Sequence, residues 1–157
     1  MFWRFGFHSV SQIDALLADD KATTLEELLE EPELLQECKA KNQKLVDLFV
    51  SHLFYKALIS SLISPEHVSS LLKYLLGDDL DEEKQFKYPY LVCEIINCEI
   101  DQLLDAIIDK EELLNYIWKY LDSEPPLNSL RASYFSRANA VLMDRNPTKV
   151  ALSFFLI

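Results

Sequence analysis

Residues 64–77 read SPEHVSSLLKYLLG, and this stretch decides the fold because it holds a whole amphipathic helix between a start signal and a stop signal. Ser64 before Pro65 is typical of a helix start, since proline has no N–H to lose in the first turn. Apolar residues then recur at intervals of three and four on one face: Val68, Leu71, Leu72, Leu75 and Leu76. Gly77 is a C-terminal stop, so the stretch predicts a short helix that buries one face.

Similar signals recur upstream of this stretch. The spacing of apolar residues predicts a helix over 10–18, and Thr24 with Glu27 reads as a capping box that opens another helix. The pair Glu31-Pro32 offers a further start. From Leu34 onward the apolar spacing predicts one long helix that continues toward Ile63.

Downstream, an acidic loop over 78–83 precedes Pro89, which we place in the first turn of a helix that continues over 90–96. Two more amphipathic helices are predicted over 100–108 and 111–121, with Asp109 placed to cap the second. The prolines of 124–126 break the chain before a helix over 127–145. A last short helix begins at 146–147.

These elements predict an all-α fold made of helix hairpins that stack as an irregular armadillo/HEAT-like helical repeat. The chain has only two glycines, which disfavours turn-rich β architectures, and a four-helix bundle would need fewer and longer helices. No strict sequence period is visible, so tetratricopeptide and ankyrin repeats are not indicated. We treat 1–157 as a single unit. Its apolar end, residues 153–157, predicts an incomplete solenoid that packs against something further along.

The charge of the chain disfavours nucleic acid as a partner. The net charge is −11, and the acidic excess lies before Arg131. Phosphate binding needs clustered Lys and Arg, so an acidic body fits a basic protein partner instead, or serves solubility alone. The three cysteines form no disulfide framework, and no signal peptide is evident. We therefore expect a cytoplasmic protein and leave a nuclear location open.

One apolar segment raises the question of a membrane span. Residues 45–63 are mostly apolar and approach the length of a span. They include Asp47, His52 and Lys56, and ionisable groups are costly in lipid. We expect a buried helix here and no membrane span.

No catalytic arrangement is visible in the sequence. The three histidines fall in unrelated segments, and Cys93 and Cys98 lack the spacing of a zinc pair. No phosphate-binding glycine loop is present, and the acidic pairs are typical of solvated helix starts and loops. We expect no metal and no cofactor, and we expect the thiols to be structural. An enzyme with a dispersed site has no support in the sequence.

Several blocks, in order, resemble the SAPS-domain family, the regulatory subunits of Ser/Thr protein phosphatase 6. The most specific are Leu35-Gln36-Glu37-Cys38-Lys39 with Asn42, and Lys87-Tyr88-Pro89. The others are Met1-Phe2-Trp3-Arg4, Ile13-Asp14, Thr24 to Leu29, Cys93-Glu94-Ile95, Cys98-Glu99-Ile100-Asp101, Pro126-Leu127-Asn128 and Ser133 to Arg137. The blocks span nearly the whole chain, and they are similar to the N-terminal part of the family's domain.

The resemblance implies a non-catalytic regulatory or scaffold subunit that binds the phosphatase 6 catalytic subunit and modulates its activity or targeting. It also implies ankyrin-repeat regulatory subunits as further partners. Our candidate partner-binding residues are Glu37, Lys39, Asn42, Tyr88, Glu94 and Asn128. The alternative for these six is a structural role, in which they cap helices or bridge neighbouring turns.

The sequence also departs from the family pattern. Family chains run to several hundred residues, so this one reads as a truncated form, and about a dozen residues around 51–61 read as extra. Two other functions therefore stay open: a generic helical adaptor for a different basic partner, and a truncated form that lacks phosphatase binding.

Overall fold

The computed structural model describes residues 13, 24–46, 66–77 and 80–155, and within them every regular element is a helix. In chain order these are α2 (Leu25–Glu30), α3 (Leu34–Lys39), α5 (Glu66–Leu76), α6 (Lys84–Asn97), α7 (Asp101–Ile108), α8 (Glu111–Trp118), the 3₁₀ helix η1 (Lys119–Asp122), α9 (Ser129–Arg145) and α10 (Pro147–Phe155). The all-α prediction is confirmed.

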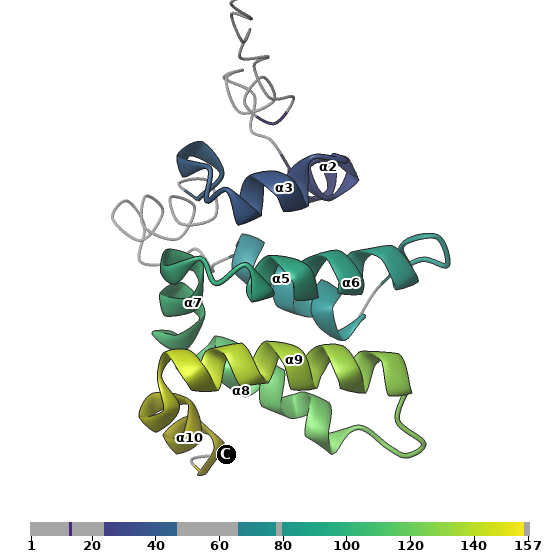
Figure 1. Cartoon of the computed structure of the whole chain (residues 1–157). Helices are drawn as coiled ribbons and strands as arrows, with labels where there is room; N and C mark the ends of the chain where they lie inside the picture. The colour runs from purple at the N-terminus through teal and green to yellow at the C-terminus, as the bar shows by residue number, and fades with distance from the viewer. Residues whose placement is uncertain (1–12, 14–23, 47–65, 78–79, 156–157) are drawn as a thin grey trace, which may run out of the picture.

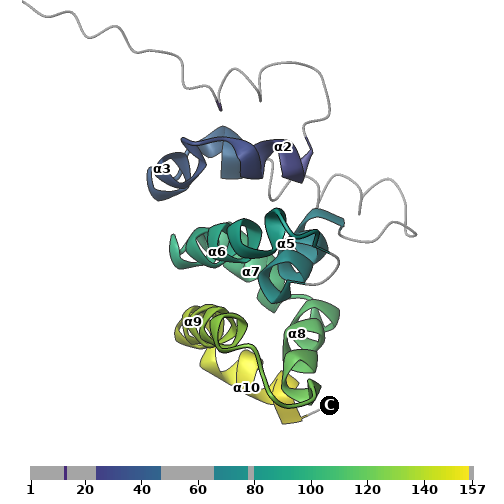
Figure 2. The same ribbon diagram turned by 90° about the vertical axis from the view of Figure 1, so that its right-hand side faces the viewer.

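The helices stack in three tiers (Figure 1). The first tier holds α2 and α3, the second holds α5, α6 and α7, and the third holds α8, α9 and α10. Seen from the side, α2, α5 and α8 form one column and α3, α6 and α9 form another (Figure 2). Helices pack against the next member of their own column, as expected for stacked helix hairpins. Within a tier, α5 packs against α6, and α10 packs against both α8 and α9.

The second and third tiers repeat one pattern of helices. Each tier runs in the same order, and its short last helix follows its longest one. Corresponding helices begin about 45 residues apart, at Glu66 and Glu111, at Lys84 and Ser129, and at Asp101 and Pro147. This spacing is typical of armadillo and HEAT units. The repeat is therefore visible in the order and spacing of the helices.

One apolar core runs through all three tiers. It begins with Ile13 and the leucines of α2, continues through Leu72, Val92 and Ile96, and reaches Leu142 and Val150 in the third tier. The predicted helix of residues 64–77 contributes Val68, Leu71, Leu72, Leu75 and Leu76, all of them buried. The burial confirms the apolar face predicted from the sequence.

Gly77 ends α5 as predicted. Its φ of +76° lies in the left-handed region, where a side chain is strained. A Cβ atom built on Gly77 would also lie 2.7 Å from the Arg131 guanidinium carbon, because α9 of the third tier passes over this turn. The missing side chain of Gly77 thus allows both the left-handed turn that ends α5 and the close approach of Arg131 from the third tier.

The predicted long helix from Leu34 is wrong. Helix α3 ends at Lys39, and a second helical stretch begins at residue 43. Lys41 adopts a φ of +52° between them, and the Asn42 side-chain oxygen accepts hydrogen bonds from the Lys44 and Leu45 amides. This Asn cap restarts the chain in a new direction, which the apolar spacing does not reveal. The start at Glu31-Pro32 is also displaced, since α3 begins at Leu34 and Pro32 lies in the preceding turn.

Two other helix starts differ from the prediction. Helix α6 begins at Lys84, so Pro89 lies inside it rather than in its first turn. An interior proline costs about 3 kcal/mol, and here the burial of Tyr88, Pro89 and Val92 offsets that cost. Asp109 ends α7 and does not cap α8, because the extended cap residue is Lys110.

The remaining segments follow the prediction closely or lie outside the described residues. Asn128 caps α9, and α10 begins at Pro147. In the C-terminal part of α10, Leu152, Phe154 and Phe155 are exposed, whereas Ser153 is buried. The predicted helix over 10–18, apart from Ile13, and the possible extra residues around 51–61 lie outside the described residues, as does most of the apolar segment 45–63.

Candidate partner-binding surface

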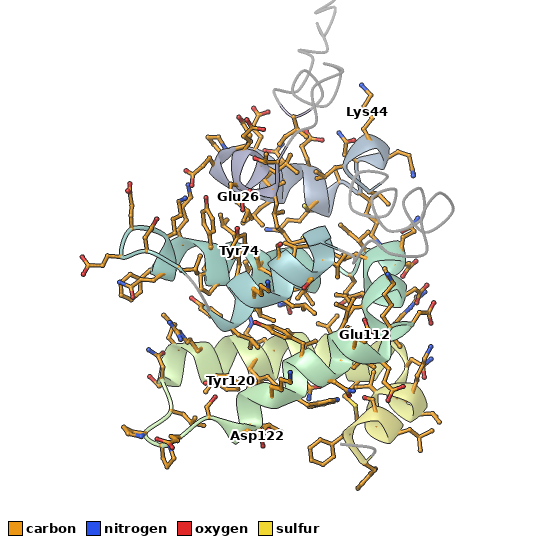
Figure 3. All side chains as sticks on the ribbon, turned by 180° about the vertical axis from the view of Figure 1, so that it is seen from behind. Glu26, Lys44, Tyr74, Glu112, Tyr120 and Asp122 are labelled. Atoms are coloured by element: carbon orange, nitrogen blue, oxygen red, sulfur yellow. The ribbon has the colours of Figure 1, made fainter. Side chains whose placement is uncertain are left out.

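Hydrogen bonds that carboxylates of α2 accept join the first tier to the second. The Tyr88 hydroxyl donates to Glu30 Oε1 at 2.9 Å, and Lys87 Nζ donates to Glu30 Oε2 at 2.5 Å. The Tyr74 hydroxyl donates to Glu26 in the same way, and Figure 3 shows this pair across the gap between α2 and α5. Burial and the neighbouring carboxylate raise the pKa of both tyrosines, that of Tyr74 to about 12, so both hydroxyls stay protonated donors.

A groove of about 580 Å³ opens beside these contacts. Five glutamates, two lysines and a tyrosine line it: Glu26, Glu27, Glu30, Glu31, Glu83, Lys84, Lys87 and Tyr88. Negative charge therefore exceeds positive charge along its walls. An excess of negative charge of this kind is complementary to a positively charged surface.

Glu30 makes the stability of this contact depend on pH. Its hydrogen bonds to Lys87 and then to Tyr88 hold its pKa below the ordinary value of 4.5. A carboxyl with a depressed folded pKa stabilises the fold above its unfolded pKa, and that stabilisation is lost as the pH falls through the folded value. The native chain should therefore be more stable than Glu30→Gln, and the difference in their free energies of unfolding should be largest near neutral pH. This difference should shrink below about pH 4.5. Urea unfolding at pH values from neutral to below about 4.5 measures this difference in free energy. When Lys87→Met is also present, the pKa of Glu30 should be depressed less, so the stabilisation by Glu30 should be lost at a higher pH.

Three predicted partner-binding residues lie around the end of α3. Asn42 Nδ2 donates to Glu37 Oε2 at 2.7 Å, while Asn42 Oδ1 caps the next helical stretch. Glu37 and Asn42 thus fix the turn that ends α3. Lys39 is exposed at the last position of that helix.

The other three predicted residues hold tiers and helix ends together. Tyr88 is 1% exposed and binds Glu30. Glu94 pairs with Arg137 of α9 at 2.7 Å and is half-buried. Asn128 Oδ1 accepts hydrogen bonds from the Leu130 and Arg131 amides at the start of α9. Five of the six candidates therefore have structural contacts, and their role in binding a partner stays a prediction.

Asn128 provides a direct test of that structural role. Replacing an Asn cap by Ala leaves two first-turn amides without their acceptor, so Asn128→Ala should lower the free energy of unfolding by about 1 kcal/mol. Asn128→Asp keeps an acceptor and should be near neutral. Thermal unfolding followed by circular dichroism compares the three proteins, and equal midpoints for Ala and the native residue would contradict a capping role.

Sequence reasoning missed two features of this surface. Glu30 gave no signal, because its partners Lys87 and Tyr88 lie more than fifty residues away. The exposed apolar side chains Phe86, Leu127 and Leu130 were also missed. A break in the helical periodicity of apolar residues could have pointed to Phe86, which lies on the solvent side of α6.

The described cysteines fit structural thiols. Cys38 and Cys93 are buried, Cys98 is half-buried, and none forms a disulfide. Burial raises the pKa of all three thiols, that of Cys38 to about 12, which keeps them protonated and unreactive at neutral pH. Within the described parts of the chain, no group of three or more His, Cys, Asp or Glu is placed to hold a metal ion.

None of the described helices has both the length and the apolar character that crossing a membrane requires.

The chain matches curated proteins along almost its whole length. It is 38% identical over 152 residues to mouse serine/threonine-protein phosphatase 6 regulatory subunit 2, covering 97% of this chain and 15% of that protein. It is 35% identical over 148 residues to human regulatory subunit 1, covering 92% of this chain and 15% of that protein. It is 34% identical over 160 residues to extragenic suppressor of kinetochore protein 1 of Schizosaccharomyces pombe, covering 92% of this chain and 18% of that protein. No family model and no solved structure matches the chain.

Fold and surface together define a helical-repeat protein of the armadillo-like class, with an acidic groove beside α2 and α6. The matches to curated proteins then assign the chain to a family within this class. The resemblance to the SAPS-domain family is confirmed, and the chain is a homologue of phosphatase 6 regulatory subunits that spans about 15% of their length. These relatives are named as regulatory rather than catalytic subunits, which supports the prediction of a non-enzymatic protein.

Proposed function

We propose that this chain acts as a non-catalytic regulatory or scaffold unit that binds the catalytic subunit of Ser/Thr protein phosphatase 6. The observation that carries this proposal is its 34–38% identity to named regulatory subunits and to the yeast suppressor over more than nine-tenths of its length. Binding would modulate or direct the phosphatase without contributing a catalytic group. The same proposal includes ankyrin-repeat subunits as further partners. It also includes a cytoplasmic location, with a nuclear location as the alternative.

The physical character of the surface supports a binding role. The charged lining of the groove between α2 and α6 is available to another protein. Stacked helices present such surfaces on rigid elements, which lowers the conformational entropy lost on binding.

A second candidate is a helical adaptor for a basic partner other than the phosphatase. The acidic groove favours it, because charge complementarity of this kind does not depend on the family of the partner. Affinity capture followed by mass spectrometry separates the two functions. Recovery of basic proteins without phosphatase 6 subunits would support the adaptor.

Co-expression with the phosphatase 6 catalytic subunit tests the first proposal. The chain and the catalytic subunit should co-elute from size exclusion as one complex, with full-length mouse regulatory subunit 2 as the positive control. If the chain elutes alone and folded, while the mouse subunit co-elutes, the proposal is wrong for this chain. That result would favour a form that lacks phosphatase binding.

A further inference from the structure

Three large apolar side chains are exposed at the N-terminal ends of neighbouring helices. Phe86 in α6 is 64% exposed, and Leu127 and Leu130 at the start of α9 are 45% and 43% exposed. Single exposed apolar residues are ordinary on a protein surface. Several at one edge of one fold indicate a contact surface when they lie together.

Contacts between α6 and α9 place the starts of these two helices, and with them these side chains, on the same side of the stack. The two helices run parallel, since Cys93 Sγ approaches the Tyr134 carbonyl and Glu94 pairs with Arg137 further along. The turn at Gly77, just before α6, packs against Arg131 at the start of α9. The beginnings of both helices therefore meet at one edge, which is on the right in Figure 1 and faces the viewer in Figure 2.

The turn that carries Leu127 is held at its base. The Tyr120 hydroxyl donates to the Asn128 carbonyl at 3.4 Å, and the Ser123 amide donates to the Tyr120 carbonyl. Pro125 and Pro126 restrict the backbone between them. Every residue from 121 to 130 is exposed, so this turn projects from the stack without being loose at its ends. A fixed turn loses little entropy when it binds.

Carboxylates outnumber cations at this edge, where Lys84 of α6 lies 3.9 Å from Asp81 and Lys87 of α6 lies 2.5 Å from Glu30. Asp81, Glu82 and Glu83 precede α6, and Asp122 and Glu124 precede α9, all of them exposed. Figure 3 shows Asp122 beside the projecting turn. Glu83 also lines the acidic groove with Glu30 and Glu31, so the charge continues to the first tier. A complementary surface carries basic residues around an apolar centre.

We infer that this edge, defined by Phe86, Leu127 and Leu130 with the carboxylates at 81–83, 122 and 124, docks a basic, apolar-centred surface of the phosphatase catalytic subunit. The inference rests on the proposed function and adds the place of contact. The apolar side chains supply the affinity, and the carboxylates orient the partner. Our earlier candidates Tyr88 and Asn128 then act indirectly, because they hold the elements that carry this edge.

Paired variants of the full chain test the inference. Phe86→Ser with Leu127→Ser removes exposed apolar surface from the edge, and it should weaken binding to the catalytic subunit by at least about tenfold. Glu82→Lys with Glu83→Lys reverses charge at the start of α6, and it should weaken binding and flatten its salt dependence. Biolayer interferometry on immobilised catalytic subunit at two salt concentrations measures both effects.

Matched variants elsewhere on the molecule provide the controls. Leu152→Ser with Phe155→Ser removes exposed apolar surface from α10, and Glu111→Lys with Glu112→Lys reverses charge at the start of α8. Both should bind like the native chain. If the edge variants bind as well as the controls, or if all four lose affinity equally, the inference is wrong while the proposed function stands. If the native chain itself does not bind, the proposed function fails, and the inference fails with it.

Discussion

Replacing Tyr88 by Ala is expected to lower the free energy of unfolding by about 3–5 kcal/mol. Tyr88 is 1% exposed, and its ring meets that of Tyr74 edge-on with centroids 5.3 Å apart. Its hydroxyl donates to Glu30, and Lys84 Nζ lies 5.5 Å from its ring centre. Truncation would open a cavity between the first two tiers and remove a donor from the Glu30 carboxylate.

A series at this position separates packing from hydrogen bonding. Tyr88→Phe keeps the ring and loses the hydroxyl, so it should cost about 1–2 kcal/mol. Tyr90→Ala on the same helix is the matched control, because Tyr90 is half-exposed and should cost under about 1 kcal/mol. Urea unfolding followed by circular dichroism ranks the three. Equal losses for Tyr88→Ala and Tyr90→Ala would contradict the position of Tyr88 between tiers.

Trp118→Ala is expected to cost a similar 3–5 kcal/mol in the third tier. The indole N–H donates to Ser153 Oγ at 3.0 Å, and that hydroxyl donates to the Val150 carbonyl. The ring also packs edge-on against Phe135 and Phe154, which joins α8 to α9 and α10. Loss of the ring would leave a cavity among all three helices and remove the hydrogen bond that the Ser153 hydroxyl oxygen accepts.

The same experiment includes its own comparison. Leu121→Ala, at a half-exposed position just beyond Trp118, should change stability by less than about 1 kcal/mol. Trp118→Phe should fall between the two, since it keeps much of the ring contact and loses the hydrogen bond. A thermal midpoint for Trp118→Ala close to that of Leu121→Ala would show that α10 is not anchored through this ring.

Local signals in the sequence predicted the features that depend on neighbouring residues. Thr24 and Glu27 form the predicted capping box, with both reciprocal hydrogen bonds present. Gly77 ends α5 at a positive φ, and Asn146 precedes a helix that begins at Pro147. Each of these arrangements is decided within about four residues, so the pattern alone suffices.

Long-range packing decided the features that were missed. Pro89 continues a helix because Tyr88 and Val92 beside it are buried against other tiers. Asp109 ends α7 and pairs with Lys149 of α10 at 2.8 Å, a contact that its own segment does not encode. The turn at Lys41 and Asn42 depends on a Glu37 contact and on Lys41 Nζ binding the Glu99 carbonyl, far along the chain.

The candidate binding residues show the same contrast between what the sequence predicts and what long-range packing decides. Family resemblance selected Glu37, Tyr88, Glu94 and Asn128, and the structure gives each of them a contact with its own chain. Residues that support a fold and residues that bind a partner produce similar blocks in a sequence. The packing of α6 against α9, which lies outside any local pattern, brings the starts of these helices together and leaves Phe86 and Leu130 exposed there.

Stacking in tiers implies that amide hydrogen exchange should be graded along the chain. The second tier has a neighbour above and below, whereas each outer tier packs against helices on one side within the described residues. Amides of α5 and α6 should therefore exchange most slowly, and those of α2 and α10 fastest, through fluctuations that open one tier at a time. A partner that covers both the second and third tiers would reduce this gradient and slow exchange in α9.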